Sequence, residues 1–99
     1  MTDEPAGGVK LGRLKALGQL LNPMVHVGKG GLSESLIATV DRALGDHELI
    51  KVKFDALKEQ KKVLAPELAE RTGSRLVQRV GNVAVLYREH PDPERRKIR

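Results

Sequence analysis

Four consecutive residues, Gly28-Lys29-Gly30-Gly31, have the composition of a phosphate-binding loop. They follow a short apolar run that ends at Val27 and come just before an expected helix. Glycines at such a junction permit positive φ angles and close approach of another backbone, while the helix N-terminus offers unpaired N–H groups and partial positive charge. Lys29 adds a cation, and KH domains clamp a nucleic-acid backbone with a GxxG loop of this kind. The loop therefore predicts phosphate binding, although a tight strand-to-helix turn also collects glycine for structural reasons.

Other cations are available to extend such a site. The 18 Lys and Arg exceed the 13 Asp and Glu, and the resulting net charge of +5 favours a polyanionic partner. If the expected strands share one sheet face, their cations form a stripe, and a basic tail adds further contacts with RNA. The full set predicted to bind RNA is Gly28, Lys29, Gly30, Gly31, Lys51, Lys53, Arg75, Arg79, Arg88, Arg95, Arg96 and Lys97. Whether that face is open or covered by a helix stays undecided, and Lys58, Lys61 and Lys62 are interpreted as solvated surface.

The sequence argues against catalysis. His26, His47 and His90 do not have the spacing of a metal site, and residues 28–31 lack the length and order of a P-loop. There is no cysteine, so disulfides and thiolate zinc sites are excluded. We expect no catalytic residue, metal, cofactor or small-molecule substrate. An enzyme would require a turnover that depends on His26 or His47.

Composition also limits the class of protein. A chain of 99 residues forms one domain. No apolar run approaches the roughly 20 residues needed to span a bilayer, so we expect a cytoplasmic protein with no membrane partner. We also expect it to be a monomer. Phe54 and Tyr87 are the only aromatic residues, which argues against surfaces where bases stack on exposed rings. Tyr87 is interpreted as a core-edge residue, with base stacking as the alternative.

The pattern of apolar residues indicates which elements position these side chains. A flexible lead-in (1–9) precedes a domain (10–90) and a mobile basic tail (91–99). Helices are expected from Leu11 to before Pro23, from the N-cap Ser33 to a left-handed Gly45, and over 58–72 with a kink or late start at Pro66. Strands are expected over 24–27, 48–54, 75–80 and 83–88.

The last two strands flank Gly81-Asn82 and therefore predict a β-hairpin. Pairing across a two-residue turn places Arg75, Val77 and Arg79 on one face with Ala84, Leu86 and Arg88. The order α-β-α-β-α-β-β predicts a single α/β domain in which a mixed sheet of about four strands is covered by helices.

The residues also resemble a known family, the YhbY-type CRM domain, named for chloroplast RNA splicing and ribosome maturation. The resemblance covers roughly residues 14–98. It is carried by the order and spacing of Leu20-Leu21-Asn22-Pro23, Val25-His26-Val27-Gly28-Lys29-Gly30-Gly31-Leu32-Ser33-Glu34, His47-Glu48-Leu49-Ile50-Lys51-Val52-Lys53, Arg71-Thr72-Gly73, Val80-Gly81-Asn82, Val85-Leu86-Tyr87-Arg88 and Glu94-Arg95-Arg96-Lys97-Ile98. Pro66 departs from the family pattern, in which this helix is commonly uninterrupted.

The resemblance implies a fold similar to the C-terminal domain of bacterial translation initiation factor three. It also implies a ribosome-assembly factor that binds ribosomal RNA or a precursor particle of the large subunit, with the family's GxxG at Gly28–Gly31. An alternative is a protein-interaction module whose sheet face or edge docks on a ribosomal protein while positive charge steers it to the particle.

Overall fold

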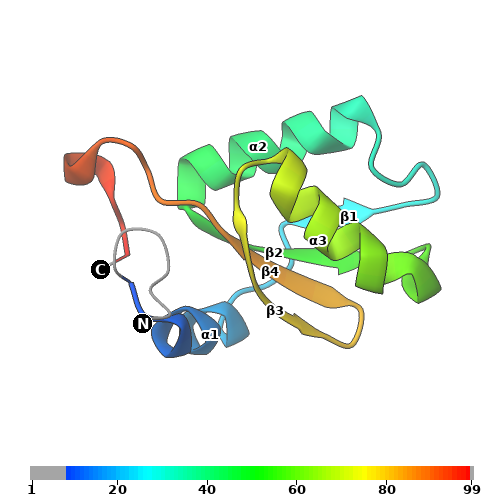
Figure 1. Cartoon of the computed structure of the whole chain (residues 1–99), viewed down its shortest axis with the longest axis horizontal. Helices are drawn as coiled ribbons and strands as arrows, with labels where there is room; N and C mark the ends of the chain where they lie inside the picture. The colour runs from blue at the N-terminus through cyan, green and yellow to red at the C-terminus, as the bar shows by residue number, and fades with distance from the viewer. Residues whose placement is uncertain (1–8, 99) are drawn as a thin grey trace.

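The protein, seen in a computed structural model that describes residues 9–98, is built on one four-stranded sheet with helices on both faces (Figure 1). The sheet order is β1-β2-β4-β3, with β1 parallel to β2 and the other neighbours antiparallel. The predicted α/β class and element order are therefore confirmed. The elements are α1 (Leu11–Gln19), β1 (Val25–Val27), α2 (Glu34–His47), β2 (Leu49–Phe54), α3 (Lys61–Arg71), β3 (Arg75–Val80) and β4 (Val83–Tyr87), with 3₁₀ turns at Lys58–Gln60 and Pro93–Arg95.

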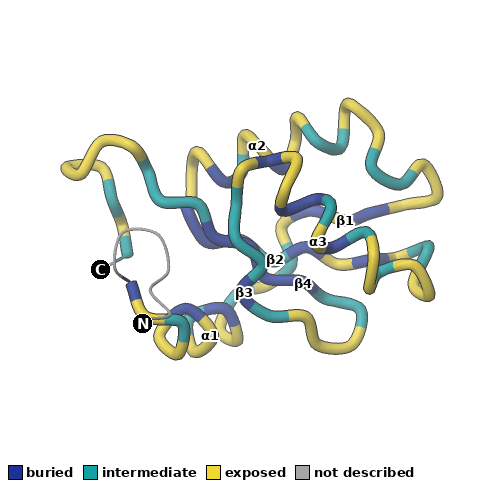
Figure 2. Tube along the Cα trace, in the orientation of Figure 1, coloured by how far each residue is buried: buried dark blue, intermediate teal, exposed yellow. Residues whose placement is uncertain are grey.

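One face of the sheet packs against α2 and α3 and forms the larger core. The alternation in β2 directs Ile50, Val52 and Phe54 into this core, where all three are fully buried. Val40 and Leu44 on α2 and Leu68 on α3 complete it. Figure 2 shows the buried positions along the strands and the exposed positions along the outer sides of the helices. Burial of this aliphatic layer is the main stabilisation of the domain.

The opposite face packs against α1. Leu14 is buried there beside Leu49, Val77 and Tyr87, and the chain before α1 adds Val9. A Cβ on Gly18 would lie 2.9 Å from Cγ1 of Val85, so this glycine lets α1 approach the sheet closely. Because α1 spans only nine residues, it leaves part of this face open.

The hairpin confirms the predicted turn but corrects the predicted faces. Gly81 has φ +58, and Val80 pairs with Val83 as expected. A β-bulge between Leu76 and Gln78 then shifts the register, so that Arg75 pairs with Tyr87. The prediction for Arg75 and Val77 was wrong, since both lie on the side of Tyr87, where Val77 is part of the α1 core.

Two helix boundaries also differ from the prediction. The second helix continues past Gly45 to His47, and the positive φ belongs to Glu48, at +66. Ser33 is the N-cap as expected, and its side chain accepts a hydrogen bond from the N–H of Leu36. Pro66 lies inside α3, which begins at Lys61 and therefore has no late start at the proline.

Glu48 explains why the C-terminal segment is held in place, contrary to the prediction of a mobile tail. Its buried carboxylate accepts hydrogen bonds from the N–H groups of His90, Lys97 and Ile98. Ile98 packs against the α1 core. Residues 1–8 and 99 of the predicted flexible ends lie outside the described residues, whereas Val9 is buried. Within residues 9–98, no helix is both long and apolar enough to cross a membrane.

Candidate functional site

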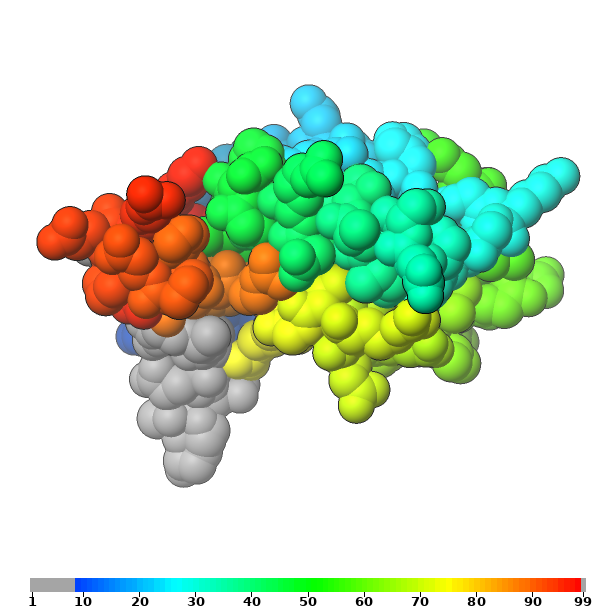
Figure 3. All heavy atoms as spheres, turned by 90° about the horizontal axis from the view of Figure 1, so that it is seen from above, coloured from blue at the N-terminus to red at the C-terminus, as the bar shows by residue number. Residues whose placement is uncertain are grey.

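The glycine loop lies between β1 and α2, at one end of the long axis (Figures 1 and 3). The N–H of Gly31 donates to the carbonyl of Gly28 at 3.0 Å and closes a turn. Gly31 has φ +65, and a Cβ there would lie 3.3 Å from Leu57, so the fold itself requires this glycine. Gly28 and Gly30 have neither constraint, because no heavy atom lies within 4 Å of an added Cβ and their φ angles are not positive.

A shallow groove of about 300 Å³ runs from this loop along the start of α2. Its lining is largely polar or backbone: Val25, His26, Gly28, Gly30, Gly31, Ser33, Ser35, Leu36 and Thr39. The Ser33 cap occupies the N–H of Leu36, but the N–H groups of Glu34 and Ser35 have no acceptor among residues 9–98. Two free donors at a helix N-terminus suit an anion, although the Glu34 carboxylate in the first turn opposes it.

The segment that follows β2 supports this loop. His26 Nδ1 lies 2.7 Å from the carboxylate of Asp55, and the N–H groups of Asp55 and Ala56 both donate to the carbonyl of Val27. Leu57 approaches Gly31 as described above. Residues 55–57 therefore hold the loop on one side, and its other side is exposed.

Sequence reasoning missed one consequence of this packing, which is a lysine cluster beside the loop. Because Leu57 reaches Gly31, the next residues bring Lys58 and Lys62 to the same end of the molecule. Both are exposed, with no ion pair or hydrogen bond to any residue in the described range, whereas Lys61 donates to Asn82. The parallel pairing of β1 and β2 is the signal for this cluster, since parallel strands end at the same edge of a sheet. We call residues 28–31 and 55–62 the loop end.

The strand cations do not form the predicted stripe. Lys51 and Lys53 pair with Val85 and Val83 and so lie on the α1 face, together with Arg75. Arg79 and Arg88 lie toward the opposite side: Arg79 pairs with Ala84, and the Arg88 side chain reaches α2.

Most of the remaining predicted cations are bound within the fold. Nη1 of Arg88 lies 2.6 Å from the Asp41 carboxylate and donates to the carbonyl of Thr72, and Nη2 donates to the carbonyl of Asp41. Arg96 pairs with Glu89 at 3.1 Å, and Lys97 Nζ donates to the carbonyl of Asp46. Arg95 makes an exposed pair with Asp92 at 3.9 Å. Residues 88–98, which we call the tail end, lie opposite the loop end along the long axis (Figures 1 and 3).

The histidines do not gather into a reactive group. His26 pairs with Asp55, and His90 Nδ1 accepts from the N–H of Asp92. His47 is the last residue of α2, whereas the groove lies at the start of that helix. In the part of the chain that the structure describes, no three His, Asp or Glu side chains come together as metal ligands would.

Comparison with known proteins agrees with this architecture. The CRS1 / YhbY (CRM) domain model matches residues 8–88. A probable RNA-binding protein of Pseudomonas aeruginosa is 40% identical over 84 residues, which are 84% of this chain and 81% of that protein. An RNA-binding protein of Haemophilus influenzae is 42% identical over 76% of this chain and 77% of its own length. The solution structure of a Staphylococcus aureus protein superposes with a TM-score of 0.74 at 36% identity, covering 90% of this chain and 94% of that one. The chain belongs to the CRS1/YhbY (CRM) domain family.

Proposed function

We propose that this protein binds structured ribosomal RNA by its phosphate backbone and acts, without catalysis, as an assembly factor on precursors of the large ribosomal subunit. In this proposal it is a cytoplasmic monomer. The names of its relatives support an RNA partner. The ribosomal role rests on the resemblance to YhbY-type proteins.

One observation carries the placement of the site at the loop. Gly28 and Gly30 are glycines that the fold does not require, and they border two unpaired N–H groups at the start of α2. Glycine at such positions lets a phosphate reach the backbone donors without meeting a side chain. Lys29 at the tip supplies the counter-charge.

The surrounding cations extend the same footprint. Lys29, Lys53, Lys58 and Lys62 have no ion pair or hydrogen bond to residues 9–98, so their charge is available to a partner. They outnumber the exposed acids Glu34, Asp55 and Glu59 at this end, and Asp55 is already paired with His26. Binding of this kind follows RNA shape more than sequence, because it engages phosphates.

The test is RNA binding by Lys29→Glu beside a matched control, Lys15→Glu, which makes the same charge change on an exposed position of α1. Fragments of large-subunit ribosomal RNA and a matched duplex DNA are titrated over a salt series. We expect Lys29→Glu to weaken RNA binding by tenfold or more. It should also lower the slope of log K against log salt by about 0.7 to 0.9. Lys15→Glu should have a much smaller effect.

Equal losses in both variants would mean that net charge, and not the loop, governs binding. A second readout is sedimentation of the protein with large-subunit precursors in cell extracts, which Lys29→Glu should abolish. If the protein stays on the particle while RNA binding is absent and salt has little effect, the docking alternative replaces this proposal, since an apolar interface responds weakly to salt.

A further inference from the structure

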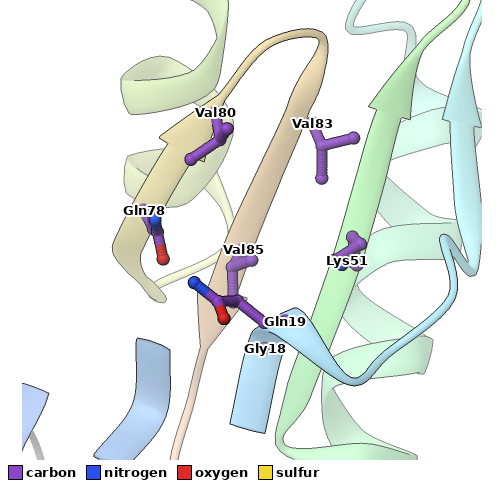
Figure 4. Close-up of a pocket in the computed structure, with 7 residues that line it drawn as sticks. All are labelled: Gly18, Gln19, Lys51, Gln78, Val80, Val83 and Val85. Carbon is purple, nitrogen blue, oxygen red and sulfur yellow. The ribbon is translucent and has the colours of Figure 1, made fainter. Parts of the chain in front are cut away.

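The α1 face of the sheet has a hollow where α1 ends. Its volume is about 230 Å³, and Figure 4 shows its lining from four elements. The lining residues are Gly18, Gln19, Lys51, Gln78, Val80, Val83 and Val85. The close approach of Gly18 to Val85 sets one wall, and the bulge in β3 precedes Gln78 on the opposite rim.

The hollow combines three kinds of group. Val83 and Val85 form an apolar floor, and Val80 on the rim is 60% exposed. Gln19 and Gln78 each offer an amide donor and acceptor. Lys51 stands on β2 with no ion pair or hydrogen bond inside the described chain. An extruded nucleobase is bound by groups of these kinds, which contact its apolar faces, its hydrogen-bonding edge and the adjoining phosphate.

A row of paired residues on the α1 face leads from the edge strand β1, which precedes the glycine loop, to the hollow. His26 lines the groove at the glycine loop and pairs across the sheet with Lys53, which pairs with Val83, which pairs with Val80. Residues paired in this way stand side by side on one face. A strand whose phosphates lie at the loop therefore passes the unpaired cation of Lys53 before it reaches the hollow.

We propose that this hollow binds one unpaired base of the RNA strand whose backbone is held at the glycine loop. The inference rests on the proposed function and adds a single-stranded element to its ligand. Charge favours a nucleotide as the occupant, because Lys51 and Lys53 both lack a carboxylate partner in residues 9–98. A hollow of about 230 Å³ has room for one base.

The test uses three probes with the full chain: hexaribonucleotides of adenosine and of uridine, and an abasic ribose-phosphate hexamer. Nuclear magnetic resonance follows the methyl groups of Val80, Val83 and Val85 and the amides of Gly30 and Gly31. We expect all three probes to shift the two amides, and only the probes with bases to shift the valine methyls.

A pair of variants measures how much the hollow contributes to affinity for the hexamers. Val80→Ala removes two methyl groups from the rim, and Val63→Ala makes the same change on α3, where the valine is 68% exposed. We expect Val80→Ala to weaken a base-bearing hexamer by about five- to tenfold and to leave the abasic hexamer unaffected. Val63→Ala should change neither affinity. Both side chains are mainly exposed, so both variants should fold.

The outcomes separate this inference from the proposed function. Amides that shift while the methyls do not would overturn the base site and favour a protein partner for this face. Methyls that shift equally with the abasic probe would also overturn it, because only phosphates would then be bound. Amides that respond to no probe would contradict the role of the loop, whereas methyl shifts seen only with bases would still support the base site.

Discussion

The two ends of the long axis are both rich in cations but use them differently. At the tail end, Arg88 and Arg96 bind carboxylates, and Lys97 binds a backbone carbonyl. At the loop end, Lys29, Lys58 and Lys62 have no such partner within residues 9–98. Cations that are bonded within the fold help to hold it together, whereas unpaired cations remain available to phosphates. The number of basic residues in a segment therefore does not indicate which segment binds RNA.

The largest effect on stability should come from the tail end. Glu48→Ala leaves three backbone N–H groups without the carboxylate that now accepts from them. We expect the free energy of unfolding to fall by about 3 kcal/mol. RNA affinity of the folded variant should stay the same. Chemical denaturation and RNA titration measure the two quantities, and a large loss of affinity in the folded protein would break the division between the ends.

Arg88→Met should also lower stability without changing RNA binding, but the loss of stability should be smaller. It removes a side chain that joins α2 to the residue after α3 through Asp41 and Thr72. The expected loss is about 2 kcal/mol of unfolding free energy, with an unchanged salt dependence of RNA binding. Arg79→Met is the matched control, because Arg79 is exposed and should change stability by less than about 0.5 kcal/mol.

Tyr87, which directly precedes the tail end, tests how a buried group affects the pH dependence of stability. Burial, followed by the charges of Glu89 and Glu48 and opposed by Arg96, raises the pKa of Tyr87 above its ordinary value of 10.0. Above that value the unfolded chain releases the proton before the folded chain does, so stability falls as pH rises. The buried hydroxyl has no hydrogen-bond partner among residues 9–98.

Tyr87→Phe should therefore keep or raise the unfolding free energy near neutral pH, by up to about 1 kcal/mol. It should also lose less stability than the parent protein between neutral pH and about pH 11. Denaturation at both pH values measures this. A marked loss near neutral pH would show that the hydroxyl has a stabilising partner.

The smallest expected effect is a gain in RNA affinity from the start of α2, next to the loop end. Glu34 places a carboxylate in the first turn of α2, beside the groove that we assign to phosphate. Glu34→Gln removes that charge and should strengthen RNA binding about two- to threefold at low salt. Weaker binding by this variant would argue that the helix N-terminus does not face the RNA.

Much of the fold followed from local patterns, because periodicity and turn residues specify elements directly. The alternation in β2, the Ser33 cap and the Gly81 turn were all predicted and confirmed. The bulge at Val77 was not predicted, because β3 presents apolar residues on each face of the sheet with or without the bulge. It moved Arg75 to the other side of the sheet and divided the expected stripe.

Side-chain pairing was the harder part of the site to predict. The glycine loop is recognisable in the sequence. The buried Glu48 that anchors the tail is not, because its hydrogen-bond partners lie 42 to 50 residues further along the chain. No local pattern reports such a contact. In the sequence, Lys58 and Lys62 resemble ordinary solvated surface, although the parallel pairing of β1 and β2 places them beside the loop.

The most direct test of the central claim compares charge removal at the two ends. One variant carries Lys58→Gln with Lys62→Gln, and the other carries Arg95→Gln with Lys97→Gln, so that each loses two exposed cations. Ribosomal RNA binding is measured over a salt series. We predict that the loop-end pair lowers the slope of log K against log salt by about 1.4 to 1.8 and that the tail-end pair leaves it unchanged. An equal or larger change in the tail-end pair would contradict the assignment of RNA binding to the loop end.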